Sequence, residues 1–82
     1  MNLDTLSTII TTLQELEQDT AVPKNVKKKI TQTILALQET GDISIKKNKA
    51  LNELDEITQD TNMQSYTRSQ LFNVVSMLEK IE

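Results

Sequence analysis

The apolar residues of this chain repeat at helical spacing from one end to the other, and this pattern limits the fold more than any other feature. Every apolar stretch recurs at steps of three and four residues, and none alternates over the length of a strand. The first stretch places six apolar side chains on one broad helical face: Leu3, Leu6, Ile9, Ile10, Leu13 and Leu16. The pattern therefore predicts an all-α protein.

Four such stretches predict four helices with short connections, at residues 3–18, 23–40, 43–58 and 63–81. Because short connections make successive helices antiparallel neighbours, residues 1–82 are expected to form one antiparallel up-down-up-down four-helix bundle. The 82 residues of the chain also suit a single domain. The alternative is a three-helix arrangement in which the first helix is mobile or swapped.

Turn and capping residues mark the expected helix boundaries. Pro23 is expected at the first position of the second helix, where its fixed φ is favourable. Gly41, the only glycine, is expected to end that helix as a left-handed C-terminal cap. Asp42 and Ser44 are candidate N-caps of the third helix. If the φ angle of Gly41 is positive, Gly41→Ala is predicted to cost about 1 kcal/mol of stability.

The tripeptide Gln-Asp-Thr occurs at residues 18–20 and again at residues 59–61, which indicates a repeat with a register of 41 residues. The same offset superposes most apolar positions: Ile10 on Leu51, Leu13 on Leu54, Leu16 on Ile57, Ile30 on Leu71, Ile34 on Val75 and Leu37 on Leu78. We therefore interpret the bundle as two similar αα-hairpins.

The acid of each tripeptide has an expected structural role. Asp19 and Asp60 follow the first and third predicted helices, where a carboxylate opposes the helix dipole. Their carboxylates are instead expected to accept hydrogen bonds from free N–H groups at the starts of the second and fourth helices. Replacing either residue by Ala is therefore predicted to destabilise the fold.

The residue types on which most enzymes and metal sites depend are missing. The chain has no Cys and no His, which excludes zinc-type sites and Ser-His or Cys-His nucleophiles built from this chain alone. Its single glycine excludes a phosphate-binding glycine loop. We expect no catalytic, cofactor-binding or metal-ligating residue, and no enzyme activity. The apolar runs are short and no secretory signal is recognisable, so a cytoplasmic protein is expected.

Two long stretches resemble an uncharacterised family of small archaeal helical proteins, uncharacterised protein family 0147. They read "DTAVPKNVKKKI" and "ALNELDEITQDTNMQSYTRSQLFNVVSMLE" and together cover much of the chain. The sequence departs from the family pattern at Lys27, Gln64 and Phe72, where Arg, Pro and Trp are more usual. The resemblance implies a four-helix bundle and an archaeal cytoplasmic source, and it implies no particular activity.

Lysines at the start of the second predicted helix form the first candidate binding surface. Lys24, Lys27, Lys28 and Lys29, together with Arg68, make a candidate anion or RNA surface, because lysines and free helix N–H groups both attract phosphate. The net charge of −3, however, gives no overall attraction to nucleic acid. No aromatic residue lies among the lysines to stack on bases.

The alternative is that neighbouring acids neutralise these cations. The bundle topology brings seven acids to the same end of the molecule: Glu15, Glu17, Asp19, Glu53, Asp55, Glu56 and Asp60. Salt bridges to these acids would offset the unfavourable dipole that lysines meet at a helix N-terminus. Asp55 or Glu56 is expected to pair with Lys27 or Arg68 rather than to act as a general acid or base. A second basic run at residues 46–49 is expected to be a solvated, partly paired face.

Aromatic and methionine residues of the fourth predicted helix form the second candidate surface. Phe72 stands about 100° from Leu71 around the helix, and its counterpart in the first hairpin is the polar Thr31. Tyr66, Phe72 and Met77 are therefore a candidate partner surface for another protein or a second copy. The alternative is that Phe72 packs against a neighbouring helix.

These observations predict a non-catalytic protein–protein interaction or assembly module, with an unidentified protein partner or with self-association. The alternative function is an RNA-associated accessory protein that uses the lysine-rich helix start. No cofactor, membrane partner or small-molecule substrate is expected.

Overall fold

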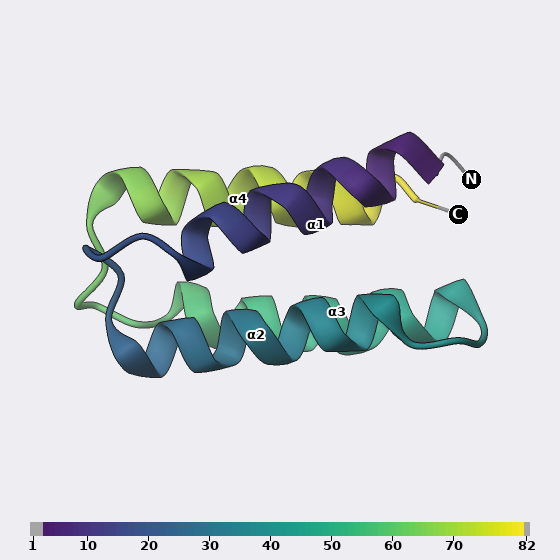
Figure 1. Ribbon diagram of the computed structural model, residues 1–82, viewed down its shortest axis with the longest axis horizontal. Coiled ribbons are helices and arrows are strands. Elements are labelled where there is room, and N and C mark those ends of the chain that lie inside the picture. Colours follow the sequence, from purple (N-terminus) through teal and green to yellow (C-terminus); the bar gives the residue numbers. More distant parts are fainter. Residues whose placement is uncertain (1–2, 82) are drawn as a thin grey trace.

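The computed structural model describes residues 3–81, and it describes the side chains of residues 5–81. These residues form four helices and no strand (Figure 1): α1 at Leu3–Glu17, α2 at Lys24–Gln38, α3 at Ile43–Thr58 and α4 at Ser65–Glu79. The all-α prediction is confirmed. None of the described helices is long and apolar enough to cross a membrane.

The four helices form an elongated bundle of 33 × 20 × 17 Å, with successive helices side by side and antiparallel (Figure 1). Each helix packs on its neighbours in the chain, and α1 closes the bundle by packing on α4. The α1–α2 and α3–α4 corners lie at one end, and the α2–α3 corner lies at the other. The first helix therefore belongs to the bundle, and the three-helix alternative is wrong.

The core consists of the apolar positions that define the helical spacing. Eight large side chains are almost completely removed from solvent: Ile9, Leu13, Ile30, Leu37, Leu54, Ile57, Leu71 and Leu78. They join one continuous cluster with further Val, Ala, Met and Leu residues from all four helices. Burial of an apolar side chain of this size stabilises the fold by about 1.5–3 kcal/mol, which is why the three-and-four spacing determines the fold.

The 41-residue register governs the helix boundaries as well as the core. The ends of α1 and α3, at Glu17 and Thr58, differ by 41 residues, and both boundaries of α2 differ from those of α4 by the same number. Core positions at this offset are buried in both hairpins, as in Leu13 and Leu54. We call two positions separated by 41 residues twins. The prediction of two similar αα-hairpins agrees with this geometry.

The two Gln-Asp-Thr corners share the same local turn. The Oδ1 atom of Asp19 accepts a hydrogen bond from the amide of Ala21 at 2.9 Å, and Oδ1 of Asp60 accepts one from the amide of Asn62 at 2.8 Å. The prediction that these acids cap α2 and α4 is therefore wrong. The two helices begin five residues later, at Lys24 and Ser65, so each carboxylate forms a short turn within the corner instead.

The helix caps differ in part from the expected ones. Pro23, which was expected to be the first helical residue of α2, is instead the N-cap, with a ψ of 150°, and the helix begins one residue later at Lys24. α2 ends at Gln38, three residues before Gly41, because Glu39 already has an extended backbone. Gly41 does have a positive φ, of 131°, but it lies in the α2–α3 corner. Asp42 caps α3 as predicted, since its side chain accepts a hydrogen bond from the Ser44 amide at 2.7 Å.

Candidate functional site

Arg68, a member of the predicted anion surface, is bound to backbone at the end of a neighbouring helix. Its Nη1 donates to the carbonyl of Thr58 at 2.5 Å, and its Nη2 donates to the carbonyl of Asp60 at 2.7 Å. These carbonyls lie at the C-terminus of α3, where a cation is favoured by the helix dipole. The forked guanidinium therefore closes the α3–α4 corner, and both of its terminal nitrogens are occupied.

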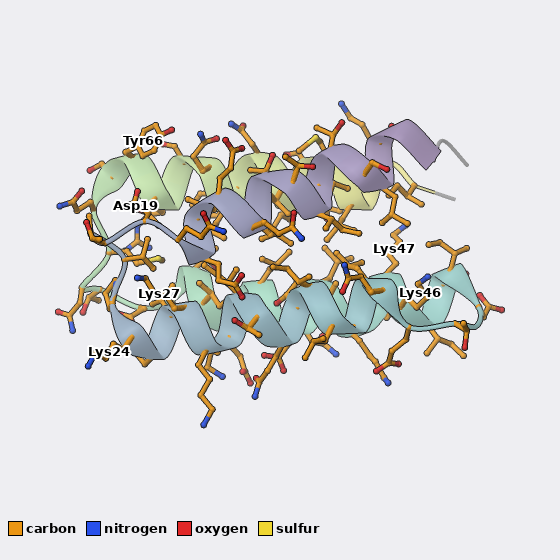
Figure 2. All side chains as sticks on the ribbon, in the orientation of Figure 1. Asp19, Lys24, Lys27, Lys46, Lys47 and Tyr66 are labelled. Atoms are coloured by element: carbon orange, nitrogen blue, oxygen red, sulfur yellow. The ribbon has the colours of Figure 1, made fainter. Side chains whose placement is uncertain are left out.

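Lys47 makes the reciprocal contact at the other end of the same hairpin. From the first turns of α3 its Nζ reaches the carbonyl of Ile81 at 2.8 Å and that of Glu79 at 3.3 Å (Figure 2). Neither α3 nor α4 has a basic residue in its own last turn. Arg68 of α4 thus provides the positive charge at the end of α3, and Lys47 of α3 provides the positive charge at the end of α4.

Lys29 is the lysine of the α2 start that has an acidic partner among the described side chains. Its Nζ lies 2.8 Å from Oε2 of Glu56 on α3. The hydrogen bond that Lys29 donates to this carboxylate, together with the negative charges of Glu56 and Glu53, raises the pKa of Lys29. Glu56 therefore pairs with Lys29 and not with Lys27 or Arg68, so that predicted pairing is wrong.

The other lysines of the α2 start make no ion pair within the part of the chain whose side chains are described. Lys24 and Lys28 are exposed and Lys27 is partly buried, and Figure 2 shows Lys24 and Lys27 at the corner end of the bundle. The neighbouring acids are occupied elsewhere: Asp19 and Asp60 bind amides in the corners, and Asp60 also accepts from the Asn25 amide nitrogen at 2.8 Å. The expected neutralisation by salt bridges is therefore limited to Lys29.

The second basic run is only lightly paired. Lys47 binds carbonyls of the α4 end, and Lys49 lies 3.5 Å from Glu39 across the α2–α3 pair, with both side chains more than half exposed. An exposed pair of this kind contributes about 0–1 kcal/mol. This run agrees with the expectation of a solvated, partly paired face.

The three residues of the predicted partner surface do not lie together. Tyr66 and Phe72 are six residues apart on α4 and therefore point about 120° away from each other. Tyr66 is 63% exposed and faces the α1 side of α4, next to Leu16, where its hydroxyl accepts a hydrogen bond from Gln70 at 2.8 Å. Met77 is partly buried and packs on the core. Phe72 is therefore separate from the other two.

Phe72 forms one wall of a shallow groove between α3 and α4. The groove has a volume of about 270 Å³. Leu51, Val75 and Phe72 give it an apolar surface, and Asp55 and Glu79 add a carboxylate from each helix. Phe72 is 52% exposed. One side of its ring lines the groove beside α3, in part as the alternative predicted, and the other side faces solvent.

Two further exposed apolar residues escaped the sequence reasoning. Leu35 on α2 is 57% exposed and Ile45 on α3 is 59% exposed. The rule that singled out Phe72, an apolar residue off the helical stripe, would have found both. The role of Lys47 was also missed, although the absence of a cation in the last turn of α4 was a usable signal.

The described residues offer no cluster of three or more acidic, His or Cys side chains that could hold a metal ion. Glu53 has one buried carboxylate oxygen without a hydrogen-bond partner, next to the salt bridge between Lys29 and Glu56.

Fold and surface together define a small four-helix bundle of two matching αα-hairpins. In the second hairpin, a basic side chain of each helix binds backbone carbonyls at the end of the other helix. The chain belongs to the Uncharacterised protein family UPF0147, whose family model matches residues 1–81. The resemblance noted in the sequence is thereby confirmed.

Archaeal relatives match over most of their length. A UPF0147 protein of Metallosphaera sedula is 41% identical over 88% of this chain and 82% of its own length, and one of Sulfurisphaera tokodaii is 39% identical over 85% and 80%. A UPF0147 protein of Thermoplasma volcanium is 34% identical over 99% of this chain and 92% of its own. The crystal structure of the unknown function protein MMP1188 has the same fold, with a TM-score of 0.93, 34% identity and coverage of 100% of this chain and 94% of that one.

Proposed function

We propose that this protein is a non-catalytic protein–protein interaction or assembly module of the archaeal cytoplasm. The observation that supports it most is Phe72, a large aromatic side chain left half exposed in the α3–α4 groove. Exposed aromatic residues beside a groove are enriched among the anchors of protein interfaces. The residue types of common catalytic sites, His and Cys, are absent from the sequence.

Affinity capture from an archaeal cell extract tests this proposal, with and without nuclease. The wild-type protein is compared with Phe72→Gln and with the matched control Leu35→Gln, which removes a similarly exposed apolar side chain from α2. We expect nuclease-resistant partners that are lost with Phe72→Gln and kept with Leu35→Gln. Partners that are equally retained by both variants, or none at all, would refute the proposal.

A second candidate function is that of an RNA-associated accessory protein. It is supported by Lys24, Lys27 and Lys28, which have no described ion-pair partner at the start of α2. Three phosphate contacts to single-stranded RNA predict a slope of about −2 for log affinity against log salt. Titration at two salt concentrations tests this with Lys24→Gln/Lys28→Gln, against Lys46→Gln/Lys80→Gln as the matched control. Absence of binding, or equal loss in both double variants, would remove this candidate.

A further inference from the structure

The residues that line the α3–α4 groove have twins on α1 and α2, and the two sets differ at the positions that would contact a partner. The apolar positions are similar in both hairpins, since the twins of Leu51 and Val75 are Ile10 and Ile34. The internal repeat therefore allows a comparison within one molecule. A feature that only the second hairpin has is not a requirement for folding a hairpin of this type.

The aromatic wall is the first difference. The twin of Phe72 is Thr31, whose hydroxyl donates a hydrogen bond to Glu17, the twin of Thr58. This contact joins α1 to α2. In the second hairpin, by contrast, Thr58 donates to the carbonyl of Asp55 on its own helix, and Phe72 remains open to solvent.

The carboxylates are the second difference. Asp55 and Glu79 line the α3–α4 groove, one from each helix, whereas their twins are the neutral Gln14 and Gln38. Glu79 in the last turn of α4 also opposes the helix dipole, so helix stability does not favour it there. No basic residue lines the α3–α4 groove. An apolar floor between two carboxylates is complementary to an apolar row flanked by cations.

The dimensions of the groove suit a helix. Its lining residues extend from Leu51 to Thr58 on α3 and from Phe72 to Glu79 on α4, which corresponds to about 10 Å along each helix axis. This is the length over which an amphipathic helix presents anchors at positions i, i+3 or i+4, and i+7.

We propose that the α3–α4 groove binds an amphipathic helix of another protein, with a row of apolar side chains flanked by Lys or Arg. Phe72 packs against the apolar row, and Asp55 and Glu79 bind the flanking cations. This inference rests on the proposed interaction function and specifies the chemistry of the partner. Nucleic acid is disfavoured as the occupant of this groove, since both charged residues that line the groove, Asp55 and Glu79, are negative.

The test is a titration of the full chain with a fluorescent amphipathic peptide of Leu and Lys, about 15 residues long, which gives four helical turns. A peptide with Glu in place of Lys serves as the opposite-charge probe. We expect saturable binding of the Leu/Lys peptide that weakens with salt, and no binding of the Leu/Glu peptide. Amide chemical shifts should change along the groove, at Leu51, Phe72 and Val75, and not at Tyr66 and Gln70 on the α1 side of α4.

Variants that install the twin residues provide the controls. Phe72→Thr should lower the affinity for the Leu/Lys peptide about tenfold. Glu79→Gln or Asp55→Gln should lower this affinity and also reduce its dependence on salt. Leu35→Thr and Glu15→Gln, which change an apolar residue and an acid elsewhere, should leave the affinity unchanged. Far-UV circular dichroism verifies that each variant is folded. Equal affinity for wild type and Phe72→Thr, or equal binding of both peptides, would overturn the inference.

The remaining outcomes separate this inference from the proposed function. If the Leu/Lys peptide does not bind but Phe72-dependent capture from extract persists, the inference is wrong and the interaction function stands. If light scattering shows a Phe72-dependent dimer that does not bind the peptide, the occupant is a second copy and the inference is likewise wrong. If neither peptide binding nor capture depends on Phe72, both proposals are wrong.

Discussion

Single residues in the corners of this bundle have backbone and hydrogen-bond roles that their neighbours cannot take over. Gly41 has a φ of +131°, and no other described residue has a positive φ. Asp19 and Asp60 each accept an amide hydrogen bond two residues ahead. The corners are therefore determined by a few residues, while the helices between them depend on many.

Replacing Gly41 by Ala should lower the free energy of unfolding by about 1 kcal/mol. A Cβ atom at this position would meet no atom within 4 Å, so the cost arises from the backbone conformation alone. Urea denaturation measures the loss, and Thr40→Ala in the same corner is the matched control, because its φ is not positive. Equal stability of the two variants would show that the corner adjusts without strain.

The pKa of Asp60 predicts a pH dependence of folding. The amide of Asn62 lowers this pKa below its usual 3.8, with further contributions from Asn25 and Arg68. Because the folded pKa is the lower one, the stabilisation is present above pH 3.8 and is lost as the pH falls through the folded value. Asp60→Asn should therefore reduce the loss of stability on acidification, measured by urea denaturation over that range. An unchanged pH profile would contradict this.

At the scale of the elements, contacts between basic side chains and helix-end carbonyls distinguish the second hairpin from the first. Arg68 of α4 binds carbonyls at the end of α3, and Lys47 of α3 binds carbonyls at the end of α4. The twin of Arg68 is Lys27, which makes no such contact among the described residues, and the twin of Lys47 is the apolar Leu6. The α3–α4 pair thus has an electrostatic link at both ends that the α1–α2 pair lacks.

Arg68 and its twin Lys27 can each be replaced by the residue of the other, and the two substitutions should change stability in opposite directions. Arg68→Lys should lower the free energy of unfolding by about 1 kcal/mol, because a lysine cannot bind two carbonyls with a rigid fork. Lys27→Arg should raise it by about 0.5 kcal/mol, because the fork can reach the carbonyl of Glu17, the twin of Thr58. Urea denaturation of both variants provides the measurement. A loss in both would mean that the two corners differ in backbone geometry.

At the scale of the whole molecule, the repeat and the position of the chain ends make the order of the hairpins interchangeable. α1 begins and α4 ends at the end of the bundle that also holds the α2–α3 corner (Figure 1). A circular permutant opened next to Gly41, with a flexible linker from α4 to α1, should therefore fold into the same bundle. Circular dichroism and thermal melting test this. A permutant opened inside α3 is the control and should be unfolded.

Helical spacing determined most of the fold in advance, because burial of Leu13, Ile30, Leu54 and Leu71 in one core requires four packed helices. The register of 41 likewise anticipated the matching hairpins. The exact end of α2 did not follow from the sequence, since Glu39 ends the helix before the glycine that was expected to do so.

The candidate site was less predictable, for two physical reasons. The grouping of Tyr66 with Phe72 neglected the angle of about 120° that six residues produce on a helix. The choice of Lys29 rather than Lys27 as the partner of Glu56 depends on side-chain reach between α2 and α3, which spacing along one helix does not define. What the sequence did identify was Phe72, because an apolar residue off the stripe has no place in the core.

The common position of the α1 start and the α4 end also determines how the molecule can be attached to something else. A surface, tag or fused protein that is linked ahead of α1 or after α4 is attached at the end of the bundle where Lys46 and Lys47 lie. The opposite end, with Lys24 and Tyr66, then points outward in either case (Figure 2). A tether at either terminus therefore presents the bundle in the same orientation, with its long sides open to solution.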